Sequence, residues 1–302
     1  MKKRKKYSKI KRMRRSIGRV LACGALLFSH NQRSFTAGAS VSPSTPSRIL
    51  SHPRNSSAVV SVVLYQYEAC PFCNKVRAYL DWKRVPYVVV EVDPLFKGVL
   101  SWSEYKKVPV AVVNGRVVTD SSAIIDAVEE ASSTGSDGKH IKLAVTAEEA
   151  KWRAWADAVL VKHLTINIYR NAGESLETFD YLTQRNFPAW SSIPAKYIGA
   201  SAMWAVAIKR RKDLGVGSEL GAERAALGGA LTELVGGMGG KPFLGGASPN
   251  IADVSIYGVL RSISGLSTFV EAVKGHGGAW EWCQRMEKEV GASQLLHRVG
   301  EK

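Results

Sequence analysis

Two cysteines separated by two residues are the strongest chemical signal in the chain, in the tetrapeptide Cys70-Pro71-Phe72-Cys73. The apolar run over 59–65 predicts a buried strand before them, and residues 74–80 have the spacing of a helix. Cys70 would then stand at a helix N-terminus, where unpaired backbone N–H groups and the positive end of the helix dipole stabilise a thiolate. The pKa of a thiol at such a position commonly falls from about 8.5 to roughly 3.5–7.5. We therefore expect Cys70 to be the reactive thiolate and Cys73 the resolving or supporting thiol.

Four neighbours of Cys70 could tune its reactivity. Lys75 and Arg77 could add positive potential from the same helix, and Pro71 falls at the first helical position, where its missing N–H costs nothing. Tyr67 precedes Cys70 by three residues and could donate a hydrogen bond to a thiolate or a peroxide oxygen. Because a tyrosine is also common at the end of a strand, a functional and a structural role for Tyr67 both stay open.

Other uses of a Cys-x-x-Cys pair fit this chain less well. A zinc site needs further ligands, but the other cysteines, Cys23 and Cys283, stand alone, and no pair of histidines has ligand spacing. Four scattered cysteines in 302 residues do not make a disulfide framework. We therefore expect redox or nucleophilic chemistry at Cys70 and no metal site. We also expect a buried inert thiol at Cys283.

The basic charge of the chain is concentrated in its first residues. The formal net charge is +16, yet residues 1–67 carry 14 of the 42 Lys and Arg residues and no Asp or Glu. The rest of the chain carries 28 basic and 26 acidic residues and is nearly neutral. It lacks the pattern of basic and aromatic residues that marks a nucleic-acid surface, so we expect no nucleic-acid partner.

Residues 1–57 have the composition of a largely disordered targeting leader. They are rich in Arg and Ser and contain no acidic residue, which favours an organellar transit peptide, mitochondrial first and plastid second. Their apolar run over 20–28 is far shorter than the roughly 20 residues that span a bilayer. A secretory signal, a signal anchor and a nuclear basic cluster over 2–15 stay open as alternatives.

Strands and helices alternate after the cysteine pair. We expect a helix over 71–83, a buried strand over 86–92 and a second short helix near 96–105. Asn114-Gly115 between two apolar runs is the signal of a hairpin with a type I′ turn, and Asp120-Ser121-Ser122 offers the side-chain oxygens that begin a helix. The order β-α-β-α-β-β-α predicts a thioredoxin/glutaredoxin-like domain over residues 58–131.

A Gly- and Ser-rich linker over 132–145 separates this α/β domain from an all-helical C-terminal domain over 146–302. Thr146 begins a capping-box pattern, followed by six residues that share one helix face: Trp152, Trp155, Val159, His163, Ile166 and Tyr169. Further helices are expected over 196–212 and 222–235, after Asn250, and over 280–290. Core packing is the default for Trp152 and Trp155, although an apolar pocket over Cys70 would also use them.

This combination resembles the glutathione S-transferase superfamily, in which a thioredoxin-like domain precedes a helical one. Three strings carry the resemblance, which covers roughly residues 59–298: residues 65–73, Lys106-Lys107-Val108-Pro109-Val110 and Asp120-Ser121-Ser122. It implies that Val108-Pro109 forms a cis-proline turn, whose backbone pairs with the peptide-like backbone of glutathione. It also implies that Asp120 and Ser121 hold the γ-glutamyl carboxylate at a helix N-terminus.

Longer strings are similar to the type 2 prostaglandin E synthase family, notably residues 64–73, 86–92, 105–109 and 249–261. The resemblance implies that Cys70 is the catalytic thiol and that Tyr67, Phe72 and Cys73 line the site. The implied reaction is isomerisation of prostaglandin H2, an apolar endoperoxide, to prostaglandin E2. Glutathione is the implied cofactor, haem an additional ligand, and membrane association and a homodimer are further implications.

Two other functions stay open at this point. One is glutaredoxin-like thiol–disulfide exchange with glutathione, which needs the same Cys70 thiolate and runs through mixed disulfides. The other is a non-catalytic carrier of haem or thiols on an organellar membrane. The transit-like leader is similar to that of the organellar versions from plants and algae, which leaves the natural substrate to be determined.

Overall fold

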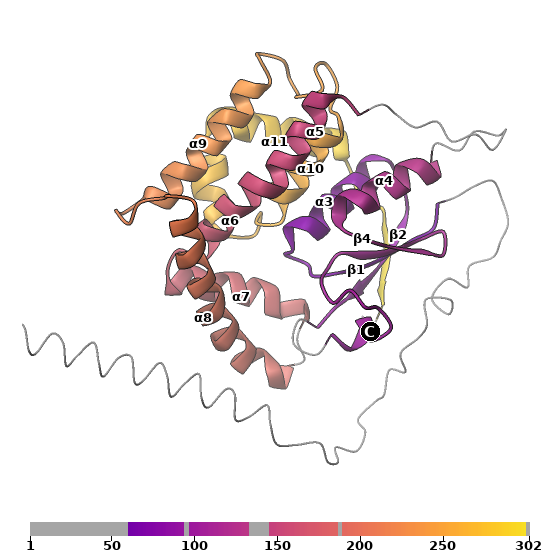
Figure 1. The fold of residues 1–302 in the computed structure, drawn as a ribbon, viewed down its shortest axis with the longest axis horizontal. Helices are drawn as coiled ribbons and strands as arrows, with labels where there is room; N and C mark the ends of the chain where they lie inside the picture. The colour runs from indigo at the N-terminus through magenta and orange to yellow at the C-terminus, as the bar shows by residue number, and fades with distance from the viewer. Residues whose placement is uncertain (1–59, 94–96, 133–144, 187–188, 300–302) are drawn as a thin grey trace, which may run out of the picture. The chain divides into compact units, whose positions relative to one another are not determined.

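The computed structural model describes residues 60–93, 97–132, 145–186 and 189–299 (Figure 1). The expected leader over 1–57 and nearly all of the expected linker lie outside these ranges. Within them, no helix combines the length and the apolar composition that crossing a bilayer requires.

Five strands form one mixed sheet in the order β4-β3-β1-β2-β5. Their bounds are β1 (Val62–Gln66), β2 (Tyr87–Glu91), β3 (Val110–Val113), β4 (Arg116–Thr119) and β5 (Leu295–Val299). β1 and β2 are parallel, whereas β3 runs antiparallel to β1 and forms a hairpin with β4. Side chains alternate along β1, so that Leu64 packs towards the helices and Tyr65 into a smaller core on the opposite face.

The expected elements around the sheet are largely confirmed. Helix α3 (Pro71–Trp82) follows the cysteine pair, α4 (Ser121–Ser132) follows the hairpin, and Asn114 and Gly115 have the positive φ angles of a type I′ turn. The short helix expected near 96–105 is present only as a 3-10 helix of three residues, η1 (Gly98–Leu100), in the described part of that segment. There the side chains of Trp102 and Lys106 bond the carbonyl groups that a helix would use.

The rest of the described chain is helical up to residue 290. Its elements are α5 (Ala147–Trp155), the π-helical turn η2 (Ala156–Leu160), α6 (Val161–Ile168), α7 (Ala172–Asn186), α8 (Ala189–Asp213), α9 (Ala222–Gly237), α10 (Ile251–Arg261), the π-helical turn η3 (Phe269–Lys274) and α11 (Gly277–Val290). The four expected later helices are confirmed, whereas α7 and the two π-helical turns were not expected. The rings of Trp152 and Trp155 are buried in the main core with their centroids 5.2 Å apart, which confirms core packing.

Helix α10 lies beside α3, the helix that carries the cysteines (Figure 1). The two backbones approach so closely at Gly258 that a Cβ atom there would lie 2.6 Å from both Asn74 O and Lys75 Cα. The expected capping box at the start of α10 is present, since Asn250 and Asp253 exchange side-chain hydrogen bonds with each other's N–H groups. The helical part of the chain therefore supports the cysteine-bearing helix directly.

The last strand departs from the expected domain division. Residues 146–302 were expected to be all-helical, yet β5 returns to the sheet and pairs in parallel with β2. Asp81 on α3 anchors this return, because its carboxylate accepts hydrogen bonds from Gln294 N, Tyr87 Oη and Arg261 Nη1. The C-terminal segment thus belongs to the same sheet as the cysteine site.

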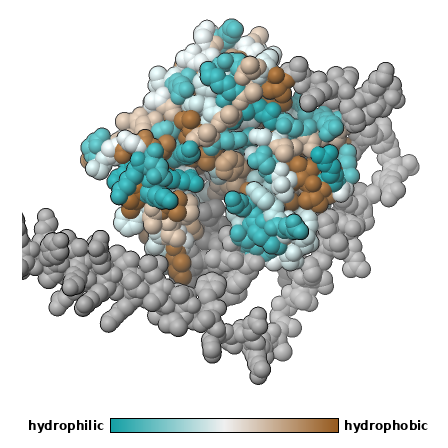
Figure 2. All heavy atoms as spheres, in the orientation of Figure 1, coloured by the Kyte–Doolittle hydropathy of each residue, from teal (hydrophilic) through white to brown (hydrophobic). Residues whose placement is uncertain are grey.

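Helix α8 leaves much of its apolar surface uncovered. Figure 2 shows hydrophobic surface over this helix, and its exposed large apolar side chains are Tyr197, Ile198, Trp204, Val206 and Ile208. The basic run over 209–212 lies at its C-terminal end, where Arg210 bonds Thr165 Oγ1 and Arg211 pairs with Glu223.

Candidate thiol site

The sheet brings three separate segments to one edge. Tyr65, near the end of β1, pairs with Val110 at the start of β3, and Val110 pairs with Thr119 at the end of β4. The residues after β1, before β3 and after β4 therefore meet at this edge. These segments are the loop 67–70, Val108-Pro109 and Asp120-Ser121.

Cys70 is the N-cap residue of α3, and its side chain is half-buried. Its pKa is lowered chiefly by the Cys73 thiol, which donates to the Cys70 sulfur, and further by the backbone N–H groups of Cys73 and Phe72. These effects outweigh burial, although neither N–H group is close enough for a full capping hydrogen bond. The pKa of Cys70 is therefore shifted in the direction expected for a thiol at a helix N-terminus, with the Cys73 thiol as the largest contributor.

Cys73 and Tyr67, the neighbours of Cys70, have raised pKa values. Burial and the neighbouring Cys70 raise the pKa of Cys73 well above its ordinary value. Burial and the charges of Cys70 and Cys73 raise the pKa of Tyr67 to about 12. Both groups are therefore proton donors at neutral pH, and Phe72 adds its N–H group while its ring packs on the main core.

The cations expected to assist Cys70 are used elsewhere. Lys75 is fully buried, with its ammonium 2.8 Å from Asp157 Oδ2 and 2.7 Å from Ser122 Oγ. Arg77 pairs with Glu68 at 3.1 Å. Both cations are therefore paired with carboxylates, and the expectation that their positive charge helps Cys70 stays a prediction.

Lys75 instead ties the α/β part of the chain to the helical part. The π-helical turn η2 carries Asp157, which bonds Lys75 on α3, and Lys75 in turn bonds Ser122 on α4. A π-helical turn contains one inserted residue, which moves the side chains after it to another face of the helix. Such turns are frequent at functional sites. The network fixes the start of α4, where Ser121 lies, against the start of α3.

The segments expected to bind glutathione have free polar groups at this edge. The Val108-Pro109 peptide bond is cis, as expected, and neither backbone polar group of Val108 bonds another residue in the described ranges. Asp120 caps α4, because its Oδ1 accepts from Ser122 N and Ala123 N. The N–H groups of Ser122 and Ala123 are therefore occupied, whereas the N–H and hydroxyl of Ser121 have no bond to another described residue.

The helical part contributes one residue that sequence reasoning did not place at the site. Tyr169, at the C-terminal end of α6, is buried, and its pKa is raised by burial and then by the charge of Cys70. Its position in the helical pattern indicated only a core residue. Nothing in the local sequence distinguishes a core tyrosine from one that faces a thiol in another domain.

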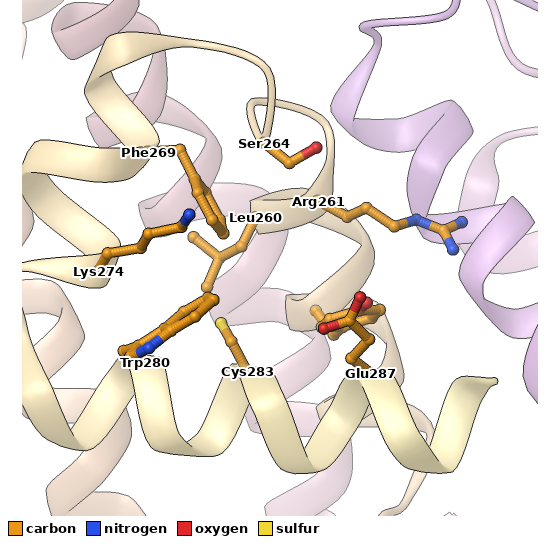
Figure 3. A pocket seen from close by; sticks show the side chains of 9 residues that line it. Leu260, Arg261, Ser264, Phe269, Lys274, Trp280, Cys283 and Glu287 are labelled. Carbon is orange, nitrogen blue, oxygen red and sulfur yellow. The ribbon is translucent and has the colours of Figure 1, made fainter.

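Cys283 lines a cavity of about 360 Å³ between α10, η3 and α11, and Cys70 is not among the residues that line it (Figure 3). Its sulfur points towards Leu260, between Trp280 and Glu287. Burial raises the pKa of Cys283 to about 12, so the expected inert thiol is supported. Among the described residues, no cluster of His, Cys, Asp or Glu has the arrangement of a metal site.

Comparisons with known proteins show the family of this chain. The glutathione S-transferase N-terminal domain family matches residues 64–136. Prostaglandin E synthase 2 of Danio rerio is 35% identical over 271 residues, which cover 76% of this chain and 71% of the relative. The Mus musculus protein of the same name is 33% identical, covering 80% of this chain and 73% of the relative. The chain belongs to the prostaglandin E synthase 2 family.

The fold of this prostaglandin E synthase 2 family member is the expected one. A thioredoxin-like mixed sheet with helices precedes a glutathione S-transferase-like helical part. Among solved structures, glutaredoxin 2 of Salmonella typhimurium in complex with glutathione is 15% identical, covers 76% of this chain and 94% of its own, and has a TM-score of 0.46.

Replacing Cys73 with alanine is expected to raise the pKa of Cys70, because the Cys73 thiol contributes most to lowering it. Cys73→Ser keeps a donor at the same position and should raise the pKa less. The rate of Cys70 alkylation by iodoacetamide follows the thiolate fraction, so its midpoint against pH measures this pKa. We expect the midpoint to lie below about 8.5 in the wild type, to be higher in Cys73→Ser and to be highest in Cys73→Ala. Equal midpoints in all three proteins would contradict the assignment.

Proposed function

We propose that this chain is a glutathione-binding thiol enzyme that isomerises prostaglandin H2 to prostaglandin E2 through the Cys70 thiolate. The observation that carries the proposal is that the Cys70 thiol, whose pKa is lowered by Cys73, lies at the same sheet edge as Val108 and Ser121. Membership of the prostaglandin E synthase 2 family supports the choice of substrate. An endoperoxide suits such a site, because its weak O–O bond is open to a soft nucleophile.

The proposed step is redox-neutral overall. The Cys70 thiolate attacks the endoperoxide oxygen on C9, the O–O bond breaks, and its electron pair leaves with the other oxygen as an alkoxide. A proton donor then converts this alkoxide to a hydroxyl group, and Tyr67, whose pKa is about 12, is placed to act as one. The Tyr67 phenolate left by this transfer takes the C9 proton, which forms the ketone, breaks the S–O bond, and returns the thiolate and the protonated tyrosine.

Glutathione is proposed to bind along the sheet edge. The free backbone polar groups of Val108 match a peptide, and the zwitterionic γ-glutamyl end meets two complementary groups. Ser121 offers an N–H and a hydroxyl at a helix N-terminus to the carboxylate, and the exposed Asp120 carboxylate offers an acceptor to the ammonium group.

Ser121→Ala is expected to weaken glutathione binding about 5- to 30-fold, equal to about 1–2 kcal/mol for a hydrogen bond to a charged group. Calorimetric titration of glutathione measures the change. Ser132→Ala, at the far end of the same helix, is a matched control, because its hydroxyl bonds only within α4. Equal affinities in wild type and Ser121→Ala would show that the carboxylate binds elsewhere.

Glutaredoxin-like thiol–disulfide exchange is the second candidate function. A specific observation favours it: Cys70 has a lowered pKa and Cys73 a raised one, which is the division of roles between an attacking and a resolving thiol. Haem, by contrast, would take its iron ligand from Cys70 or from the glutathione thiol, and would therefore occupy the sulfur that either reaction needs.

Parallel assays on two substrates test the proposal. The purified full chain is supplied with prostaglandin H2 and, separately, with a mixed disulfide of glutathione. Formation of prostaglandin E2 above the spontaneous rate supports the isomerase. Turnover of the mixed disulfide alone would reject it in favour of exchange.

The leader and the α8 surface complete the proposal. We propose that residues 1–57 direct the chain to mitochondria. We also propose that α8 contacts a membrane surface through its exposed apolar side chains and through Lys209 and Lys212, which follow them in the sequence. A fusion of residues 1–60 to a fluorescent protein is expected to reach mitochondria, or plastids in a plant cell. Diffuse cytosolic or nuclear fluorescence would refute the transit role.

A further inference from the structure

The C-terminal strand reaches the cysteine site through one guanidinium group. Arg298 on β5 lies with its Nη2 2.8 Å from Glu68 Oε2 and its Nη1 2.5 Å from Glu91 Oε1, and its side chain is only 6% exposed. Glu68 stands two residues before Cys70, and Glu91 is the last residue of β2. Arg298 therefore joins the last strand of the chain to two carboxylates that flank the cysteine pair.

Both carboxylates belong to one buried polar network. Gln66 Nε2 donates to Glu91 Oε1 at 2.8 Å and to Glu68 Oε2 at 3.3 Å, and Arg77 Nη1 lies 3.1 Å from Glu68 Oε1. Burial works against ionisation of Glu68, but Arg77 and Arg298 outweigh it and lower its pKa. The carboxylate of Glu68 is therefore charged at neutral pH, and the two guanidinium groups compensate that charge.

This network is coupled to the cysteines by backbone bonds and by charge. Asn74 Nδ2 donates to the carbonyl oxygens of Glu68 at 2.6 Å and of Cys70 at 3.1 Å, so the position of Glu68 fixes the backbone that leads into Cys70. After burial and Cys70, the charge of Glu91 further raises the pKa of Cys73. Among the described residues, Asp93 also raises the pKa of Tyr67, and the charge of Cys70 raises the pKa of Tyr169.

We propose that Arg298 is a positioning residue for Cys70: it holds the loop through Glu68 and compensates the negative charge of Glu68 and Glu91 beside the cysteine pair. The proposal rests on the reactive Cys70 thiol of the proposed function and deepens it. Because Arg298 lies on β5, replacing it changes the charge near the cysteine pair but changes no residue of α3. Without it, two carboxylates disfavour a thiolate, and Glu68 loses one of the two guanidinium groups that pair with it.

The test is the pH dependence of Cys70 alkylation by iodoacetamide in the full chain, with the modified peptide quantified by mass spectrometry. R298M is expected to raise the apparent pKa of Cys70 by about one unit and to slow alkylation about tenfold at pH values below it. R298K retains a charge but lacks the planar fork that reaches two carboxylates, so an intermediate curve is expected. Adding E91Q to R298M removes a carboxylate and is expected to restore most of the rate.

Rescue by E91Q separates this role from a merely structural one, because a loosened strand would not be repaired by removing a charge. Leu296→Ala, an exposed position on the same strand, is the matched control and should leave the curve unchanged.

Unchanged curves in both R298M and R298K overturn the proposal, as does a shift in R298M that E91Q does not reverse. If R298M does not fold, as judged by circular dichroism, R298K with and without E91Q decides. The readout is alkylation, so absence of activity on prostaglandin H2 would reject the proposed function without deciding this test.

Discussion

Replacing Cys70 with serine is expected to lower the rate of prostaglandin H2 isomerisation by at least about 10³-fold. A serine hydroxyl at this helix N-terminus stays protonated at neutral pH, whereas the structure stabilises a thiolate there through Cys73 and Phe72. Initial rates of prostaglandin E2 formation, corrected for spontaneous breakdown of the substrate, measure the loss.

Two other cysteine replacements serve as controls for this result. Cys283→Ser should be close to wild type, because that thiol is buried in a separate cavity and its pKa is raised to about 12. Cys73→Ser should retain most of the isomerase activity, since the reaction needs no resolving thiol. A Cys70→Ser protein with more than about a tenth of the wild-type rate would remove the thiolate from the mechanism.

Replacing Asp253 with alanine is expected to lower the free energy of unfolding by about 3–5 kcal/mol. The Asp253 carboxylate is fully buried and accepts four hydrogen bonds, from Leu244 N, Gly245 N, Asn250 N and Trp282 Nε1. Alanine would leave these donors without a partner inside the protein. Because total stability is commonly about 5–15 kcal/mol, the loss should be visible at once in denaturant or thermal unfolding.

Asn250→Ala is the matched control for Asp253→Ala. It removes the other half of the same capping box but strands only Asp253 N, so a loss of about 1 kcal/mol is expected. Asp253→Asn, which keeps one acceptor oxygen, should fall between the two. Equal losses from Asn250→Ala and Asp253→Ala would mean that the buried donors find other partners and that the carboxylate acts only as a helix cap.

Elements with a local signal were predictable from the sequence. The Asn114-Gly115 turn, the apolar run of β2 and the capping box of α10 each depend on residues within a short window, and the structure has all three. The position of Cys70 at a helix start is of the same kind, since strand, proline and helix pattern are contiguous. The shared role of Val108 and Ser121 at the sheet edge was predicted only from the family resemblance, because no local sequence pattern connects these two residues.

Long-range features were not predictable. Strand β5 is five residues long and mostly half-buried or exposed, and it pairs with a strand about 200 positions earlier, so no alternation marks it. The ion pair between Lys75 and Asp157 and the approach of Tyr169 to Cys70 depend on the π-helical turn η2, which shifts the helix by one residue. A sequence pattern read at a constant helical period cannot contain that shift.

Titration of the enzyme with iodoacetamide tests the central claim most directly. Samples of the full chain are alkylated to increasing extents at a pH where Cys70 reacts before the other thiols, and each is assayed for prostaglandin E2 formation from prostaglandin H2. Mass spectrometry gives the alkylated fraction of Cys70 in each sample. The predicted result is activity that falls in proportion to that fraction and reaches the spontaneous rate when Cys70 is fully modified. Enzymatic formation of prostaglandin E2 by fully alkylated protein, or none by the unmodified chain, would contradict the account.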